Sequence, residues 1–272
     1  MQRKPVGAMK RYSFIGAGNM AYAIVCGMGD ALVTVFDKIT SQYEKFPSSV
    51  IRAQSVEEAV NNADYIILSV KPQNFKELLA QIKQSGVELD GKVFISIAAG
   101  VKISSICNAL GKEVPVIRTM PNTPLLIGKG VTALSRNASV SDEAFDEIRA
   151  MFSSIGTVLT LEEEKMNEII CATSSAPAYV YHFIDCMVKE AVEQGLDEKD
   201  MLCAVCEMVK GSAEMVLRSD KTPEELVKMV TSPNGTTERA MAVFKENQFE
   251  KIISDAMKAC TKRAIELSAE LD

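Results

Sequence analysis

The sequence predicts an α/β protein in which an N-terminal doubly wound sheet is followed by an all-helical C-terminal domain. From residue 12 to about residue 159, short apolar runs alternate with helical segments, an alternation typical of right-handed βαβ units. After residue 159 the strand-like runs stop, and the remaining pattern has helical periodicity. We therefore expect two domains, covering residues 9–160 and 161–272.

Seven apolar runs in the first half are the expected strands. The run over residues 65–70 is apolar at nearly every position, as in a strand buried on both faces of a parallel sheet. Helices are expected over residues 19–28, 56–62 and 75–83, on the faces of this sheet. The expected strands are Ser13–Gly16, Leu32–Phe36, Tyr65–Val70, Val93–Ile97, Val114–Arg118, Val131–Ser135 and Thr157–Leu159.

The second half reads as a series of helices. A long helical pattern over residues 162–195 is interrupted at Pro177, and further helices are expected over residues 199–218 and 249–270. Thr222 and Pro223 have the residue types of a cap and a first helical position. The apolar stripes of these helices exceed one core, so we expect a homodimer or higher homo-oligomer.

Composition excludes several classes of partner. With a net charge of −6 at pH 7, the chain is a poor match for nucleic acid or for an anionic membrane. Seven dispersed cysteines favour free thiols and a cytoplasmic location. Cys203 and Cys206 lie within a helical pattern, so we expect no metal site. Residues 1–8 read as an extension without a secretory signal, with Met9 as an alternative start.

A glycine-rich turn follows the first expected strand and begins a helix. Gly16 allows the tight turn, Gly18 leaves room for phosphates near the backbone, and Ala21 lets the helix pack close to the strand. The positive end of the helix favours an anion. We therefore predict a Rossmann-like dinucleotide site with contacts from Gly16, Gly18, Asn19, Met20 and Ala21.

An acidic residue stands where the adenosine ribose of a dinucleotide is expected. Asp37 follows Gly16 by 21 residues and ends the second expected strand. Its carboxylate repels a 2′-phosphate and therefore favours NADH. In contrast, Lys38, Thr40 and Ser41 have side chains that can bind the 2′-phosphate of NADPH. The cofactor is therefore NADH or NADPH, and both stay open.

Three successive strands end in segments that suit a ligand crevice, because the carboxyl ends of parallel strands face it. Small residues end the strand before Gly100 and let a flat ring approach closely. We expect Pro121 and Pro124 to exclude helix and to fix a rigid loop. The expected cofactor contacts at these ends are Val70, Lys71, Pro72, Ala98, Ala99 and Asn122, in addition to Asp37 and Lys38.

The substrate is expected to need little acid–base help from the protein. The chain has one histidine, His182, in a helical and aromatic setting that favours a packing role. A protonated imine accepts hydride directly, so an imine fits this composition. The loop over residues 231–237, which precedes a helix over residues 238–245, suits a substrate carboxylate.

Together these segments resemble the pyrroline-5-carboxylate reductase family. The matching segments are Gly16–Ala21, Ala63–Gln73, Ser96–Val101, Arg118–Pro124, Ser175–Tyr179 and Ser232–Thr237. The resemblance implies NAD(P)H-dependent reduction of 1-pyrroline-5-carboxylate to L-proline in proline biosynthesis, and a helical domain that forms dimers and often decamers. It also implies that Thr237 is the catalytic residue at the ring nitrogen and that the substrate contacts are Ser232, Gly235, Thr236, Thr237 and Met120.

Some residues depart from the family pattern. Asn234 replaces a usual glycine, Val56 stands where an asparagine is frequent, and Glu238 and Arg239 place charge near the expected pocket. The substrate can therefore be a related cyclic imine acid. Two alternatives remain: a 3-hydroxyacid dehydrogenase with the same two-domain plan, and a non-catalytic nucleotide-binding protein.

Overall fold

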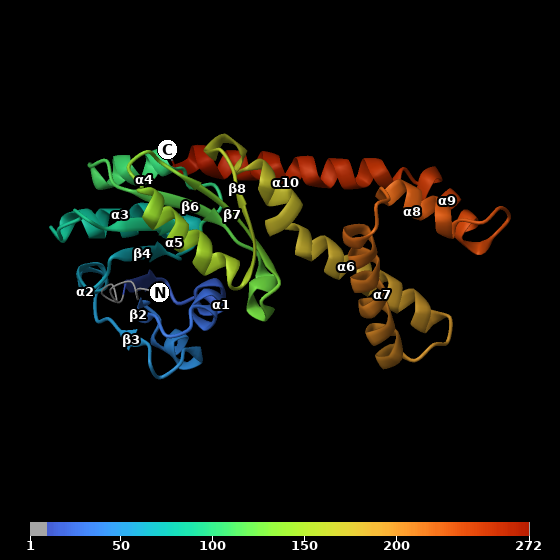
Figure 1. The fold of residues 1–272 in the computed structure, drawn as a ribbon, viewed down its shortest axis with the longest axis horizontal. Helices are drawn as coiled ribbons and strands as arrows, with labels where there is room; N and C mark the ends of the chain where they lie inside the picture. Colours follow the sequence, from blue (N-terminus) through green and yellow to red (C-terminus); the bar gives the residue numbers. More distant parts are fainter. Residues whose placement is uncertain (1–9, 272) are drawn as a thin grey trace, which may run out of the picture. The chain divides into compact units, whose positions relative to one another are not determined.

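An eight-stranded sheet forms the first part of the chain in a computed structural model that describes residues 10–271 (Figure 1). The strand order is β3-β2-β1-β4-β5-β6-β7-β8, and every pair is parallel except β6 with β7. The strands are β1 (Arg11–Ile15), β2 (Leu32–Phe36), β3 (Ile51–Arg52), β4 (Tyr65–Leu68), β5 (Val93–Ser96), β6 (Val116–Met120), β7 (Gly130–Arg136) and β8 (Gly156–Thr160). The seven expected strands are confirmed, Leu32–Phe36 with the expected ends and the other six with shifted ends, and β3 is an addition. The expectations for residues 1–8 and for Met9 lie outside the described residues.

Five helices cover the two faces of the sheet. Side chains of α1 and α5 share one core cluster with the strands, and those of α2, α3 and α4 share the other. Within β4, Tyr65 and Ile67 enter the first cluster while Ile66 and Leu68 enter the second, as expected for a strand buried on both faces. The helices are α1 (Asn19–Gly27), α2 (Val56–Asn61), α3 (Phe75–Gln84), α4 (Ile103–Leu110) and α5 (Asp142–Ser153).

One sequence prediction about proline is wrong and another is confirmed. Residues Thr123–Ile127 form a 3-10 helix, because Pro124 lies in its first turn, where a missing N–H costs no hydrogen bond. The interruption expected at Pro177 is confirmed within two residues, because Ser175 separates a π-helix (Ile170–Ser174) from α6 (Ala176–Glu193). Before the π-helix, the pattern contains a 3-10 turn (Glu163–Lys165).

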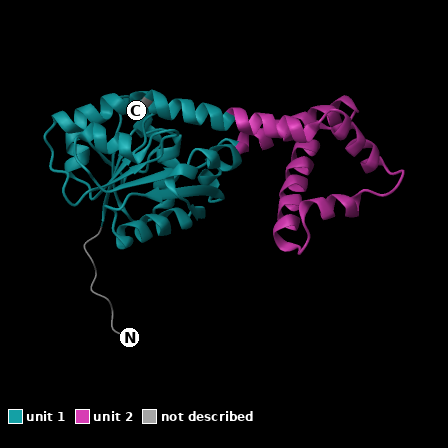
Figure 2. Ribbon diagram, turned by 90° about the horizontal axis from the view of Figure 1, so that it is seen from above, with its two compact units in different colours: residues 1–175, 260–272 teal, residues 176–259 magenta. Residues whose placement is uncertain are grey.

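The remaining helices are α6 (Ala176–Glu193), α7 (Glu198–Arg218), α8 (Pro223–Val230), α9 (Thr236–Glu246) and α10 (Phe249–Leu271). The chain divides into two compact units: one extends to Ser175 and resumes at Cys260, and the other comprises Ala176–Ala259 (Figure 2). Thr222 caps α8 as expected, in a capping box with Glu225. Among the described residues, no helix is long and apolar enough to cross a membrane.

The last turns of α10 belong to the first unit. The carbonyl of Glu270 accepts a hydrogen bond from Lys76 Nζ of α3 at 3.1 Å. A Cβ added at Gly100 would lie 3.1 Å from Leu267 Cβ, so this glycine permits close packing between the end of β5 and α10. The end of the chain thus stabilises the sheet-containing unit.

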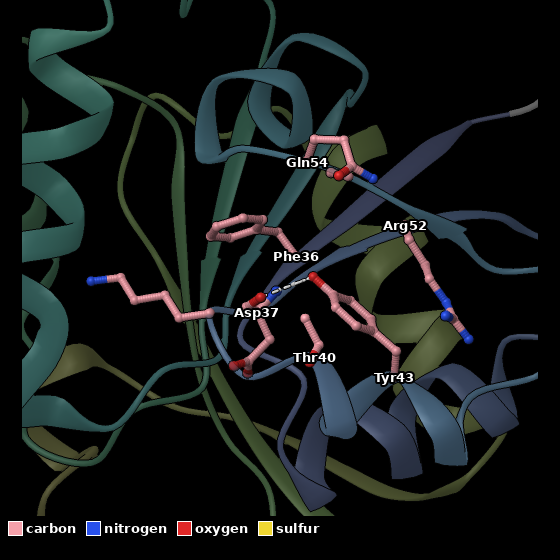
Figure 3. Close-up of a pocket in the computed structure, with 8 residues that line it drawn as sticks. Phe36, Asp37, Thr40, Tyr43, Arg52 and Gln54 are labelled. Carbon is pink, nitrogen blue, oxygen red and sulfur yellow. Dashed lines mark hydrogen bonds between the residues drawn. The ribbon is translucent and has the colours of Figure 1, made fainter.

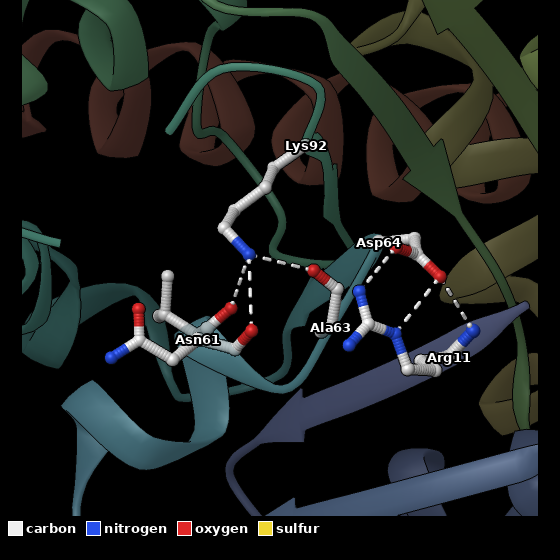
Figure 4. A network of polar contacts seen from close by, with 6 residues as sticks. Arg11, Asn61, Ala63, Asp64 and Lys92 are labelled. Atoms are coloured by element: carbon white, nitrogen blue, oxygen red, sulfur yellow. Dashed lines mark hydrogen bonds and ion pairs between the residues drawn. The ribbon is translucent and has the colours of Figure 1, made fainter. Parts of the chain in front are cut away.

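A lysine caps α2 on the amino side of the sheet (Figure 4). Lys92 Nζ donates to the carbonyls of Val60 and Ala63, each at 2.8 Å. Burial lowers the pKa of this half-buried lysine. Nearby, Arg11 donates from Nη2 and Nε to the carboxylate of Asp64 at 2.7 and 3.2 Å, and this lowers the pKa of Asp64. The two contacts join the beginnings of β1, β4 and β5.

We expect Lys92→Met to lower the free energy of unfolding by about 1–2 kcal/mol, because two carbonyls at a helix C-terminus lose a charged donor. Urea unfolding followed by circular dichroism measures this change. The control is Lys129→Met at an exposed position, which should leave the unfolding midpoint unchanged. Equal midpoints for the two variants would contradict the capping role.

Candidate active site

The glycine turn between β1 and α1 has the geometry of an anion site. Gly16 adopts a φ of +107°, and a Cβ there would lie 2.6 Å from the Ser69 carbonyl oxygen. A Cβ on Gly18 would meet no atom within 4 Å, so the space above it is open. Gly18 is the N-cap of α1 and provides no side-chain cap, which leaves N–H groups of the first turn available to a phosphate.

This turn borders a cleft of about 550 Å³ at the carboxyl ends of β1, β2 and β4. Ser69 lines the cleft, and its hydroxyl donates a hydrogen bond to the Gly16 carbonyl at 2.6 Å. Lys71 is exposed at the rim. The cleft is lined by Ile15, Gly16, Gly18, Phe36, Asp37, Lys38, Ile39, Gln42, Val56, Ser69, Val70, Lys71, Asn74, Glu77, Leu78 and Gln81.

Asp37 lies in this cleft and also holds the glycine turn. Its Oδ2 accepts a hydrogen bond from the Ala17 N–H at 2.7 Å, and its Oδ1 accepts one from the Ile39 N–H at 2.8 Å. The Asp37 N–H in turn donates to the Tyr43 hydroxyl at 2.7 Å (Figure 3). The acid that is predicted to bind the ribose therefore has a structural function that the sequence spacing did not indicate, and its ribose contact stays a prediction.

Lys38 is paired across the same cleft. Its Nζ lies 2.6 Å from Glu77 Oε1 of α3, and both side chains are exposed. Val56, which replaces a frequent asparagine of the family, lines the cleft with an apolar side chain. The end of the cleft where adenosine is expected thus contains an acid, Asp37, that is hydrogen-bonded to backbone N–H groups, and a lysine, Lys38, that is paired with Glu77.

The other strand ends are more tightly packed than expected. Ala98 is buried, and Met120 packs in a core cluster with Met166 and Ile170. Asn122 is 6% exposed, and its amide is already used: Oδ1 accepts from Val131 N at 2.8 Å and Nδ2 donates to Thr173 O at 3.1 Å. The predicted ligand contacts of these residues and of Ala99 stay predictions.

The predicted substrate loop begins α9 in the second unit. Asn234 adopts a φ of +60°, so it keeps the turn that a glycine usually makes there. Gly235 is the N-cap, and Thr236 and Thr237 follow as the first helical residues, with no side-chain cap. Glu238 reaches back and accepts a hydrogen bond from the Asn234 N–H at 2.8 Å. One N–H of the loop is therefore already occupied by a side chain of the same helix.

Sequence analysis did not identify three residues beside the cleft: Ser69, Tyr43 and Arg52. Their neighbours are set by the tertiary fold and carry no local motif. His182 is exposed on α6, with its Nε2 3.8 Å from Cys186 Sγ, so the packing that we expected for it is not found within this chain. Among the residues that the structure describes, no group of three or more His, Cys, Asp and Glu side chains is placed to hold a metal ion.

Two protein-family models match the chain. The model described as pyrroline-5-carboxylate reductase dimerisation matches residues 163–267. The model described as NADP oxidoreductase, coenzyme F420-dependent, matches residues 11–100. The glycine turn lies within the second match, and the predicted substrate loop lies within the first.

Relatives match this chain over nearly its whole length. The pyrroline-5-carboxylate reductase of Pseudomonas aeruginosa is 35% identical over 269 residues, covering 96% of this chain and 98% of that protein. That of Escherichia coli is 34% identical over 269 residues, covering 95% and 98%. The crystal structure of Plasmodium falciparum pyrroline carboxylate reductase with NADP bound superposes with a TM-score of 0.88, at 26% identity, over 95% of this chain and 98% of that one. The resemblance is thus confirmed, and the chain belongs to the pyrroline-5-carboxylate reductase family of NAD(P)H-dependent oxidoreductases.

Proposed function

We propose that this protein reduces 1-pyrroline-5-carboxylate to L-proline with NADH or NADPH, the last step of proline biosynthesis. One observation carries the proposal: an uncapped helix behind Gly16 and Gly18 faces an open cleft of about 550 Å³. The relatives of similar length that carry the name of this reductase support it.

The chain's own residues would position the cofactor. Asn19 and Met20 begin α1 behind the turn and offer backbone N–H groups to the pyrophosphate, while Ala21 keeps the helix close to the sheet. Asp37 faces the ribose, and Lys71 at the rim provides positive charge. The further contacts that we propose are Lys38, Val70, Pro72, Ala98, Ala99 and Asn122. A reduced nicotinamide held in this way supplies the hydride.

The loop before α9 would position the substrate. We assign the carboxylate to Ser232, Gly235 and Thr236, because a helix N-terminus with two hydroxyl residues favours an anion. Thr237 would hydrogen-bond the ring nitrogen, and Met120 is a further contact. The protein then acts by orientation and charge placement, since a protonated C=N bond needs no general acid for hydride transfer.

We assign residues 9–160 to cofactor binding and residues 161–272 to substrate binding and dimerisation. The match of the dimerisation model to residues 163–267 supports a homodimer or a higher homo-oligomer such as a decamer. Apolar side chains on α7, such as Leu202, Met215 and Leu217, are more than half exposed in the single chain, as expected of surfaces that a second copy covers. We place the protein in the cytoplasm.

A spectrophotometric assay tests the function. Purified protein is mixed with NADH or NADPH and with pyrroline-5-carboxylate, and the loss of absorbance of the reduced cofactor is followed. The oxidised cofactors with 3-hydroxyisobutyrate test the alternative hydroxyacid dehydrogenase. Turnover of that compound, or binding of the cofactor without any imine reduction, would contradict the proposal.

We expect Thr237→Ala to lower kcat at least 10-fold while the Kd for NADH and NADPH changes less than about 2-fold, because the hydroxyl acts at the imine. Steady-state kinetics and equilibrium titration measure the two quantities. Thr237→Ser, which keeps the hydroxyl, is the control and should retain most of the activity. Loss of cofactor affinity with unchanged turnover of the bound complex would contradict the role of this loop.

A further inference from the structure

We propose that Arg52 binds the 2′-phosphate of NADPH in a second pocket beside the cofactor cleft. This inference depends on the proposed NAD(P)H site. The pocket has a volume of about 520 Å³ (Figure 3). It is lined by Phe36, Asp37, Lys38, Thr40, Tyr43, Arg52, Ala53 and Gln54.

The second pocket meets the cofactor cleft at the residue that is expected to face the ribose. Phe36, Asp37 and Lys38 line both hollows. NADH needs only the first hollow, with its pyrophosphate at Gly18 and its ribose at Asp37. A group attached to the 2′-oxygen projects from the ribose, and the adjoining pocket offers the space for it.

Arg52 has the free charge that such a group requires. Among the described residues, no carboxylate lies within ion-pair distance of its guanidinium. The guanidinium lies over the Tyr43 ring, with Cζ 5.4 Å from the ring centroid. A guanidinium that lies against an aromatic ring keeps its N–H groups available for bidentate bonding to a phosphate.

Tyr43 fixes that guanidinium relative to the ribose position. The Tyr43 side chain is buried, and its hydroxyl accepts from the Asp37 N–H at 2.7 Å and donates to the Asp37 carbonyl at 3.0 Å. The end of β2, the tyrosine ring and the arginine therefore form one connected unit. Arg52 pairs with Val35 of β2 and lines the same pocket as Asp37, with the Tyr43 ring between the two side chains (Figure 3).

Of the two cationic side chains that line this pocket, Arg52 is more available to a phosphate than Lys38. Lys38 is already paired with Glu77 at 2.6 Å, so it is less available than Arg52. Both oxygens of Asp37 accept backbone N–H bonds, which offset part of its negative charge. In NADPH the 3′-hydroxyl remains as a donor to Asp37, so the acid does not exclude the phosphate.

Calorimetric titration with 2′,5′-ADP and 5′-AMP tests this assignment without turnover, because the two ligands differ only in the 2′-phosphate. We expect the wild-type protein to bind 2′,5′-ADP more tightly than 5′-AMP. We expect Arg52→Met to weaken 2′,5′-ADP about 10- to 100-fold and 5′-AMP less than about 2-fold, as for the loss of a charged hydrogen-bonded pair. Arg52→Lys should fall between wild type and Arg52→Met, because it keeps the charge and loses the planar fork.

Arg149→Met is the matched control, since it removes an equal charge from α5, which lines neither pocket. It should leave both affinities unchanged. Equal weakening of both ligands by Arg52→Met would assign the arginine to the adenine and overturn the proposal. Unchanged binding of 2′,5′-ADP would overturn it as well. A wild-type protein that binds 5′-AMP but gains nothing from the 2′-phosphate would contradict this inference alone, whereas one that binds neither ligand would contradict the cofactor site itself.

Discussion

Replacing Gly16 with alanine should abolish binding of NADH and NADPH and lower the free energy of unfolding by about 3 kcal/mol. A Cβ at this position would lie 2.6 Å from the Ser69 carbonyl oxygen and 2.9 Å from the Val70 nitrogen. The backbone φ of +107° is strained for any residue with a side chain. Both penalties fall on the turn that would hold the pyrophosphate.

Neither Ser69 nor Val70 can move away from such a Cβ without the loss of a backbone hydrogen bond. The Ser69 N–H donates to the Ile15 carbonyl at 2.9 Å, and Gly16 N–H donates to the Phe36 carbonyl at 2.7 Å. The turn is thus bonded to β4 on one side and to β2 on the other. A shift that relieves the collision would break one of these bonds.

Gly18→Ala separates the structural effect from the ligand effect. A Cβ on Gly18 meets nothing within 4 Å, and its φ is −69°, so this variant should unfold at nearly the wild-type urea concentration. Its methyl group would instead occupy the space of the phosphates and weaken the cofactor. Calorimetric titration and urea unfolding of both variants measure the two effects. Wild-type stability of Gly16→Ala would contradict the steric argument, and unchanged cofactor affinity of Gly18→Ala would contradict the pyrophosphate site.

The parts of the fold that the sequence predicted are those with a local signature. The apolar run of β4 and the glycine turn can each be recognised from six consecutive residues. β3 has only Ile51 and Arg52, both exposed, so no apolar run marked it. Because that strand was not predicted, Arg52 could not be paired with the end of β2, and the second pocket was not foreseen.

The sequence predicted where the residues of the candidate site lie along the strands, but it did not predict their hydrogen-bond partners. Spacing placed Asp37 at the end of β2, but its bond to the Ala17 N–H depends on how the turn folds back. Asn122 was expected at the crevice, yet its amide joins β7 to the π-helix, a partner 51 residues away. Long-range hydrogen bonds of this kind have no sequence period, so pattern analysis cannot assign them.

The same limit applies to Arg118, which the sequence placed only as the end of a strand. Arg118 is 2% exposed, and its Nη2 donates to Asn167 Oδ1 at 2.6 Å. Its Nη1 lies 3.4 Å from Glu163 Oε1, and its Nε has no partner among the described residues. Burial lowers the pKa of Arg118, while the Glu163 carboxylate opposes that shift. Glu163 therefore provides the main compensation for this buried cation, and Glu168 adds a smaller one.

Glu163 also holds the start of a helix. Its Oε1 accepts from the Ile103 N–H at 2.7 Å, at the first residue of α4. Asn167 continues the contacts to α10, because its Nδ2 donates to Ser268 Oγ at 3.1 Å. The group connects β6, α4 and the last turns of α10 within the first unit.

We expect Glu163→Gln to lower the free energy of unfolding by about 2–4 kcal/mol, because glutamine keeps an acceptor for Ile103 but removes the main charge that compensates the cation. Arg118→Met should cost less, about 1–3 kcal/mol, since the Glu163 side chain is 29% exposed and can be rehydrated. In the double variant no buried charge remains, so its cost should fall below the sum of the two by at least about 1 kcal/mol. Urea unfolding of the four proteins measures this coupling. Additive costs would mean that the buried guanidinium does not depend on Glu163, because water or another group would then be compensating its charge.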